Sequence, residues 1–184
     1  MPAPSFAIRR VGGRDEIRIP ARWSIGALLF FVVWLIAWSV AGAALARWWP
    51  PWTWIGLVWL AAKLVFGWFY AGVALAWMLG GVERIAVTDQ DLIVRYAILG
   101  VPVVTRTYRG RDIRYLGVSG MPQAGGFADP SPPFLSSSRC GALKFLHRES
   151  TVYLGHDLGA ADARSVVLWL ARLLPSGAME DQAV

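Results

Sequence analysis

Residues 48–54 read WWPPWTW, and this stretch separates the two most apolar segments of the chain. Residues 23–46 carry no charged side chain, and residues 52–79 carry only Lys63. Each segment exceeds the ~20 apolar residues that a helix needs to cross about 30 Å of hydrocarbon. Two consecutive prolines end a helix, because each lacks a backbone donor and restricts the residue before it. Residues 23–80 are therefore predicted to form a hairpin of two transmembrane helices with a tight turn at 47–51.

Tryptophan flanks both sides of this predicted turn. Its ring is apolar and its indole N–H is polar, so tryptophan favours the headgroup level of a bilayer. We expect an interfacial belt formed by Trp48, Trp49, Trp52 and Trp54. The alternative is a cleavable signal peptide, since residues 44–46 read ALA. However, a signal peptide has an apolar region of only about 7 to 15 residues, and here a second apolar segment follows at once.

The composition is that of an integral membrane protein with one small folded domain. Of 184 residues 56% are hydrophobic and eleven are tryptophan, which is too apolar for an ordinary soluble domain. The single cysteine, Cys140, excludes an intrachain disulfide. Residues 1–22 are a basic segment, whereas the turn holds only Arg47; the basic residues of the segment are Arg9, Arg10, Arg14, Arg18 and Arg22. Under the positive-inside rule both termini are predicted to be cytoplasmic.

Lys63 is the one charge within the predicted spans. It lies about 16 Å along the helix from Trp52, close to the midplane, where a charge costs roughly 2.5 to 3.5 kcal/mol. Neither span contains an acidic partner. The ammonium either snorkels outward or contacts a carboxylate or carbonyl of another protein.

Small residues recur along the second span. Gly67 with Ala71, and Gly72 with Ala76, form small-xxx-small pairs that let another backbone approach closely. The simpler interpretation is packing within the hairpin, and the alternative is contact with a partner subunit.

After residue 80 the chain becomes rich in β-branched residues and turn signals, which indicates antiparallel strands. We predict turns at 89–91 and 99–102, and strands at 82–88, 92–98, 103–108, 113–118, 142–147 and 152–155. A final helix is predicted from its apolar face, with Gly159 as N-cap, Asp162 in the first turn, Arg172 in the last and Pro175 beyond. That face comprises Val166, Val167, Leu170, Leu173 and Leu174. The predicted fold is therefore a helical membrane hairpin followed by an antiparallel β-barrel, or a bent sheet as the alternative, capped by one C-terminal α-helix, with a loose tail at 176–184.

Two segments, GGVERIAVTDQDLIVRYAILG (80–100) and GALKFLHRESTVYLGHDLGAADARSVVLWLARLLP (141–175), follow the two spans. In this combination the chain resembles small bacterial membrane proteins that carry a pleckstrin-homology-like domain. The resemblance covers roughly residues 24–175. It implies a seven-stranded, helix-capped barrel at 81–175 on the cytoplasmic face of the bacterial inner membrane, usually without assigned chemistry. It does not extend to phosphoinositide binding, because Asp89 and Asp91 in the first loop would repel a phosphorylated head group.

Residues 106–114 read RTYRGRDIR and hold the most basic cluster of the domain: Arg106, Arg109, Arg111 and Arg114. Arginine binds phosphate and carboxylate bidentately, and a basic side chain near an anionic leaflet gains about 1 kcal/mol. The cluster could therefore contact anionic phospholipid or a partner, or it could be a solvated turn. Nucleic acid is not expected as a partner, because no aromatic side chains form a stacking platform.

Residues 119–139 are rich in Gly, Pro and Ser and are predicted to form a loop, one too long for a routine hairpin connection. Its apolar side chains include Met121, Phe127, Phe134 and Leu135. They are candidates for docking onto a partner or dipping into the membrane interface, and the alternative is a simple insertion.

No pattern predicts an enzyme, a metal or a cofactor. Cys140 and His147 fit no nucleophile motif, and residues 136–138 lack a G-x-S-x-G context. His147, His156 and Asp157 lack the spacing of a metal site. We therefore predict a non-catalytic interaction and assembly module that binds another membrane protein; the alternative is a lipid-responsive regulator that binds anionic head groups and tunes membrane properties.

Overall fold

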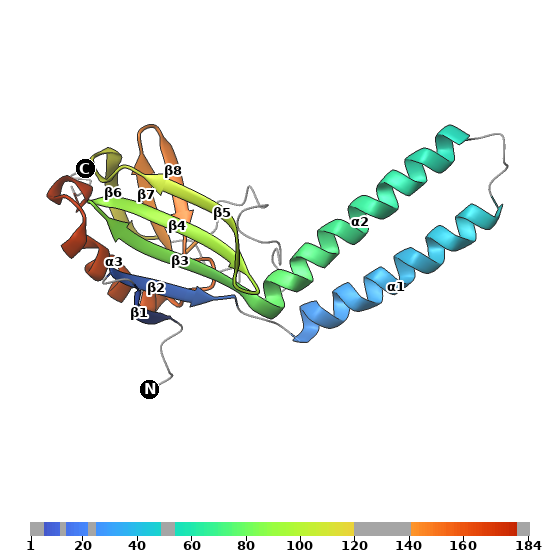
Figure 1. The fold of residues 1–184 in the computed structure, drawn as a ribbon, viewed down its shortest axis with the longest axis horizontal. Helices are drawn as coiled ribbons and strands as arrows, with labels where there is room; N and C mark the ends of the chain where they lie inside the picture. Colours follow the sequence, from blue (N-terminus) through green and yellow to red (C-terminus); the bar gives the residue numbers. More distant parts are fainter. Residues whose placement is uncertain (1–5, 12–13, 22–24, 49–53, 120–140, 180–184) are drawn as a thin grey trace.

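The computed structural model describes residues 6–11, 14–21, 25–48, 54–119 and 141–179 of the chain (Figure 1). Two long helices, α1 (Ile25–Trp48) and α2 (Trp54–Gly80), run side by side away from a domain built of strands and a shorter helix. The predicted helical pair is confirmed, although α1 continues through Arg47 and Trp48, which the sequence had placed in the turn.

Both helices are long and apolar enough to cross a membrane. The most apolar windows are Ile25–Ala44 and Leu60–Gly80, and only 17% and 22% of these windows is buried within the protein. A core helix of a soluble protein would be mostly buried instead. The apolar surface of α1 and α2 is therefore left for lipid or for another protein to cover.

The helices contact each other through small residues set against large ones. A Cβ added at Gly42 would lie 2.8 Å from Leu64, and one added at Gly67 would lie 3.0 Å from the Trp38 indole nitrogen. Ala71 is fully buried in a cluster whose other core members are Ala27, Phe31, Ala74 and Met78. Gly67 and Ala71 thus pack within the hairpin, as the simpler interpretation predicted. Gly72 faces open space, and Ala76 is half-buried.

The first sheet is antiparallel and has five strands in the order β1-β2-β3-β4-β5. Three of them, β3 (Gly81–Thr88), β4 (Asp91–Ile98) and β5 (Val101–Tyr108), confirm predicted strands. The other two, β1 (Ala7–Val11) and β2 (Arg14–Pro20), lie in the basic N-terminal segment, where no strand was predicted. Because β2 pairs with β3 and the helices lie between them in sequence, the hairpin is an insertion between two neighbouring strands.

The second sheet has three antiparallel strands in the order β6-β7-β8. They are β6 (Ile113–Val118), β7 (Leu143–His147) and β8 (Ser150–Leu154), again close to the predicted ranges. A short 3-10 turn, η1 (Gly110–Asp112), separates β5 from β6, and no ladder between described residues joins the two sheets. The prediction of a closed barrel is therefore wrong: this turn redirects the chain, so β6 starts a sheet of its own.

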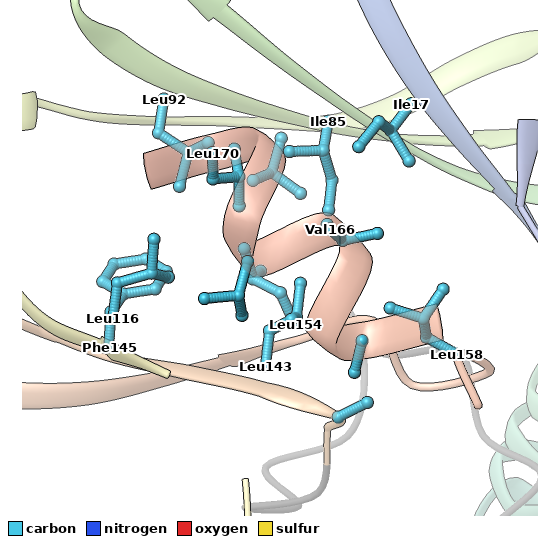
Figure 2. Close-up of a cluster of buried hydrophobic side chains, with 14 of the residues drawn as sticks. Ile17, Ile85, Leu92, Leu116, Leu143, Phe145, Leu154, Leu158, Val166 and Leu170 are labelled. Carbon is cyan, nitrogen blue, oxygen red and sulfur yellow. The ribbon is translucent and has the colours of Figure 1, made fainter. Parts of the chain in front are cut away.

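Helix α3 (Ala160–Leu173) packs into the space between the two sheets. Figure 2 shows Val166 and Leu170 of α3 between side chains of the first sheet and side chains of the second. Those of the first sheet are Ile17, Ile85 and Leu92, and those of the second are Leu116, Leu143, Phe145 and Leu154. All seven are at most 5% exposed. Their burial supplies the main stabilising term of the domain.

The termini of α3 agree with the sequence prediction. Gly159 is the N-cap, Asp162 lies in the first turn and Arg172 in the last. Val166, Val167, Leu170 and Leu174 are buried, whereas Leu173, predicted for the same face, is 42% exposed. The predicted loose tail is also corrected at its start, because residues Ser176–Met179 form the 3-10 turn η2 and Ala178 is 1% exposed.

Candidate functional site

Helix α2 passes into strand β3 without a connecting residue, since Gly80 ends the helix and Gly81 begins the strand. The Trp77 side chain of α2 is 4% exposed and belongs to the core of the strand domain, where its ring lies 6.2 Å from the Tyr96 ring. A Cβ at Gly81 would collide with the backbone and ring of Trp77. The hairpin and the domain are therefore joined tightly.

Glu83 lies just beyond this junction, on the core-facing side of β3. Side chains alternate between the faces of a strand, so Glu83 shares its face with Ile85, and it is only 2% exposed. The backbone N–H of Gly155 donates to both of its carboxyl oxygens, at 3.2 and 3.1 Å, and the Tyr96 hydroxyl donates to one of them at 3.4 Å. Since Gly155 directly follows β8, the carboxyl group connects the first sheet to the second.

The environment of Glu83 changes its protonation. Burial raises its pKa from the ordinary 4.5 to about 7, and the nearby charge of Asp157 acts in the same direction. Hydrogen bonds from the Gly155 and His156 backbone and from Tyr96 oppose this rise. Burial and the neighbouring Glu83 also raise the pKa of Tyr96. The junction therefore holds a carboxyl group that gains or loses a proton near neutral pH.

Glu83 was not among the residues singled out from the sequence. The available signal was its position: in VERIAV, residues 82–87, a glutamate occupies the same alternating set as Ile85. An ionised glutamate is rarely buried without partners, so the alternation alone does not predict a buried charge at this position.

The four predicted arginines lie on β5, around η1 and on β6, in the part of the domain that includes its end far from α2. Arg106 is exposed on β5, Arg109 and Arg111 are exposed around η1, and Arg114 is exposed on β6. The N–H of Gly110 in η1 donates to Asp91 at the start of β4, at 3.1 Å, and β3 runs eight residues from α2 to reach that turn. The segment between β5 and β6 that carries Arg109 and Arg111 therefore lies at the end of the domain far from the helices (Figure 1).

Carboxylates share this far end with the arginines. Asp112 lies 3.8 Å from Arg111 and 3.5 Å from Arg148. Three more acidic side chains, Asp89, Asp91 and Glu149, lie on the adjoining turns or at their edges. Exposed pairs of this kind contribute little to stability, about 0 to 1 kcal/mol. The surface is mixed in charge rather than uniformly basic.

Lys63 lies in the first turn of the apolar window Leu60–Gly80 and is exposed. Counted from the junction, it is about 25 Å along the helix from Gly80, at 1.5 Å per residue. Since hydrocarbon is about 30 Å thick, an ammonium there is within reach of the opposite boundary. The candidate span Leu60–Gly80 thus puts Lys63 near one end, whereas the count from Trp52 put it near the midplane, and the position near the end favours the snorkelling interpretation. At the same end, Trp54 is 67% exposed at the start of α2, and Trp48 ends α1.

Several predicted residues lie outside the described part of the chain: Trp49, Trp52, Met121, Phe127, Phe134, Leu135 and Cys140. The two histidines are not brought together, because His147 ends β7 while His156 follows β8, at opposite ends of a strand pair. His147 packs edge-on against Tyr108, with ring centroids 5.3 Å apart. Within the described ranges no group of three His, Cys, Asp or Glu side chains could hold a metal ion. Comparison of the chain with family models, with curated proteins and with solved structures gives no match.

Proposed function

We propose that this protein is a non-catalytic, membrane-anchored interaction module that presents a PH-like domain at the cytoplasmic face of the bacterial inner membrane and binds another membrane protein. The observation that carries this proposal is the pairing of β2 with β3, in which Pro20 lies opposite Val82. The N–H of Ala21 also donates to the carbonyl of Gly81, at 2.9 Å. Strand β2 precedes α1 and β3 follows α2, so their pairing supports a hairpin that enters and leaves the membrane on one side.

The arginine distribution supports the cytoplasm as that side, because the segment before α1 is basic and the turn is not. Cys140 gives a direct test of this orientation. A membrane-impermeant maleimide should leave Cys140 unlabelled in intact cells and should label it once the cells are permeabilised. In a Cys140→Ser background, Thr53→Cys, which lies between α1 and α2 in the sequence, should be labelled from outside. Labelling of Cys140 in intact cells would contradict the orientation.

The direct connection between α2 and β3 supports a partner in the same membrane. Trp77 and the Ala21–Gly81 hydrogen bond hold the domain against the end of α2. The distance of the domain from the proposed membrane surface and its orientation are therefore restricted. A domain held in this way meets other membrane proteins on its sides more readily than soluble proteins at a distance. The alternative, binding of anionic lipid through the arginines, has less support, since Arg109 and Arg111 are at the end far from α2.

The outer strand β5 is the surface that fits a protein partner best. Among the described residues it pairs only with β4, and its Thr105, Arg106 and Thr107 side chains are exposed. An outer strand offers unpaired N–H and C=O groups to which a strand of another chain can add. We therefore assign the partner contact to this edge.

Photocrosslinking in native membranes tests the assignment. A photoreactive residue at Thr105 or Thr107 should crosslink to one membrane protein, whereas the same residue at Arg164, exposed on α3, should not. A four-residue Gly/Ser insertion between Gly80 and Gly81 should abolish the crosslink, because the domain is then no longer held. The matched control is the same insertion between Arg148 and Glu149, which should leave the crosslink unchanged. Crosslinks to phospholipid alone would favour the lipid-binding alternative.

A further inference from the structure

Two hairpin turns of the same geometry lie at opposite ends of the first sheet. Asp89 and Gln90 between β3 and β4 have φ values of 50° and 68°, and Leu99 and Gly100 between β4 and β5 have values of 50° and 86°. Two consecutive residues with positive φ form the tight turn that antiparallel strands favour, usually with Asn, Asp or Gly in these positions. The far turn is polar, as expected. The turn beside α2 has an apolar, branched residue in its first position.

The apolar turn lies against the end of α2. The N–H of Leu99 donates to the carbonyl of Gly80 at 2.9 Å, and a Cβ at Gly80 would collide with the Leu99 side chain. Gly80 is also the last residue of the apolar window Leu60–Gly80. The turn is therefore level with the point at which α2 leaves the candidate membrane span.

The side chains at this level are apolar and exposed. Residues 98–104 read ILGVPVV and carry no charge. Leu99 is 70% exposed, Val101 64% and Val103 48%, and Leu79, the residue before Gly80 on α2, is 64% exposed. Further along β5, at Thr105, Arg106 and Thr107, the exposed side chains become polar. The surface of the sheet thus changes from apolar to polar with increasing separation from α2.

We propose that the β4–β5 turn, with Leu99, Val101 and Val103, is immersed in the surface of the bilayer from which α2 emerges, as a third membrane contact of the chain. This inference rests on the anchoring of α1 and α2 in a membrane, and it does not depend on the protein partner. The occupant is lipid because the exposed, apolar Leu99 contacts Gly80, the residue at which the candidate span ends. The left-handed backbone of Leu99 supports it, since a bulky residue there is strained and persists where its side chain has a use.

Depth measurement on the full chain tests this proposal. In a Cys140→Ser background, a nitroxide is attached to Leu99→Cys, and the protein is reconstituted at low density in phosphatidylcholine vesicles. Collision rates with oxygen, which concentrates in lipid, and with a water-soluble nickel chelate are then compared. The matched control is Gln90→Cys, in the turn of the same geometry at the far end. Val103→Cys leaves the turn unaltered and gives an independent reading, and Phe66→Cys, at a position 79% exposed on α2, reports insertion of the helices.

We expect labels at Leu99 and Val103 to collide with oxygen as a lipid-exposed site does, and with nickel several-fold less than the label at Gln90. Equal nickel accessibility at Leu99, Val103 and Gln90, with Phe66 in lipid, would overturn the proposal and leave the anchoring intact. Low accessibility to both reagents would show contact with protein, such as a second copy, and would also overturn it. Water-accessible labels at both Phe66 and Leu99 would refute the membrane anchoring itself.

Discussion

The Glu83 carboxyl group accepts the backbone N–H of Gly155 through both of its oxygens, at 3.2 and 3.1 Å, across 72 residues of sequence. This contact joins β3 of the first sheet to the residue after β8 of the second. No strand ladder between described residues joins the sheets, so they are connected by side chains: this carboxyl group, the ring of Tyr108 against Phe145 and His147, and the apolar side chains around α3. The protonation of one side chain thereby affects how firmly the two halves of the domain are held.

Unfolding of the domain should depend on pH through Glu83. Its pKa is about 7 in the folded protein and 4.5 ordinarily, so the folded state binds this proton more tightly. Its contribution to the free energy of unfolding is therefore complete below pH 4.5. This contribution falls by about 3 kcal/mol in total as the pH rises from 4.5 through 7. Glu83→Gln should remove this decline and unfold at higher denaturant concentration than the natural protein at pH 8. Denaturation in detergent at pH 5 and pH 8 measures it.

Glu149→Gln is the matched control for that experiment, because Glu149 is exposed and should leave the pH profile unchanged. If Glu83→Gln and the natural protein lost stability in parallel between pH 5 and pH 8, the decline would have another origin.

Trp77→Ala should destabilise the strand domain although Trp77 belongs to α2. The side chain is 4% exposed within the core of the domain, and removal of a buried tryptophan costs about 3 to 5 kcal/mol. The denaturation midpoint of the domain measures this loss. Trp68→Ala, at a position 51% exposed on the same helix, should have little effect, and a comparable loss there would indicate a general effect on α2.

Gly67→Ala should weaken the contact between the two long helices. The new Cβ would lie 3.0 Å from the indole nitrogen of Trp38 and 3.3 Å from the ring of Trp34, so both rings must shift. Overpacking of this kind costs about 1 to 3 kcal/mol. Gly72→Ala has open space around it and should be neutral. Thermal stability of the full chain in detergent compares the two, and equal values would contradict the observed packing.

Lys63→Leu should leave membrane insertion and the proposed complex intact, because Lys63 lies three residues from the end of the candidate span Leu60–Gly80. A lysine moved to Phe69 lies about 16 Å from Gly80, near the midplane. Phe69→Lys should therefore reduce insertion, at a cost of about 2.5 to 3.5 kcal/mol. The amount of each variant in the membrane fraction measures the difference. Loss of the complex on Lys63→Leu alone would instead support an intramembrane contact to a partner.

The elements after residue 80 could be predicted from the sequence because each carries a local signal. Alternating β-branched residues mark β3 to β5, and the apolar spacing of three and four marks α3. Strands β1 and β2 were missed because their charged side chains, such as Arg9 and Arg10, conceal the pattern. The pairing of β2 with β3 is also non-local, so no short window reveals it.

The arginine cluster could be located from the sequence, whereas its surroundings could not. Asp112 is adjacent in sequence to Arg111, but Arg148 reaches it only through the pairing of β6 with β7. The turn at Leu99 was predicted correctly, but it is shorter than predicted. Strand β5 already begins at Val101, so Pro102 lies within the strand and not in the turn. A proline is tolerated there because β5 is an outer strand.

The insertion of the two helices between β2 and β3 has a consequence for synthesis. Strand β2 emerges from the ribosome before α1, and its partner emerges only after α2 is complete. The amino-terminal strands therefore lack their neighbour until the whole hairpin has been synthesised. A nascent chain that stalls before Gly81 leaves the sheet unfinished.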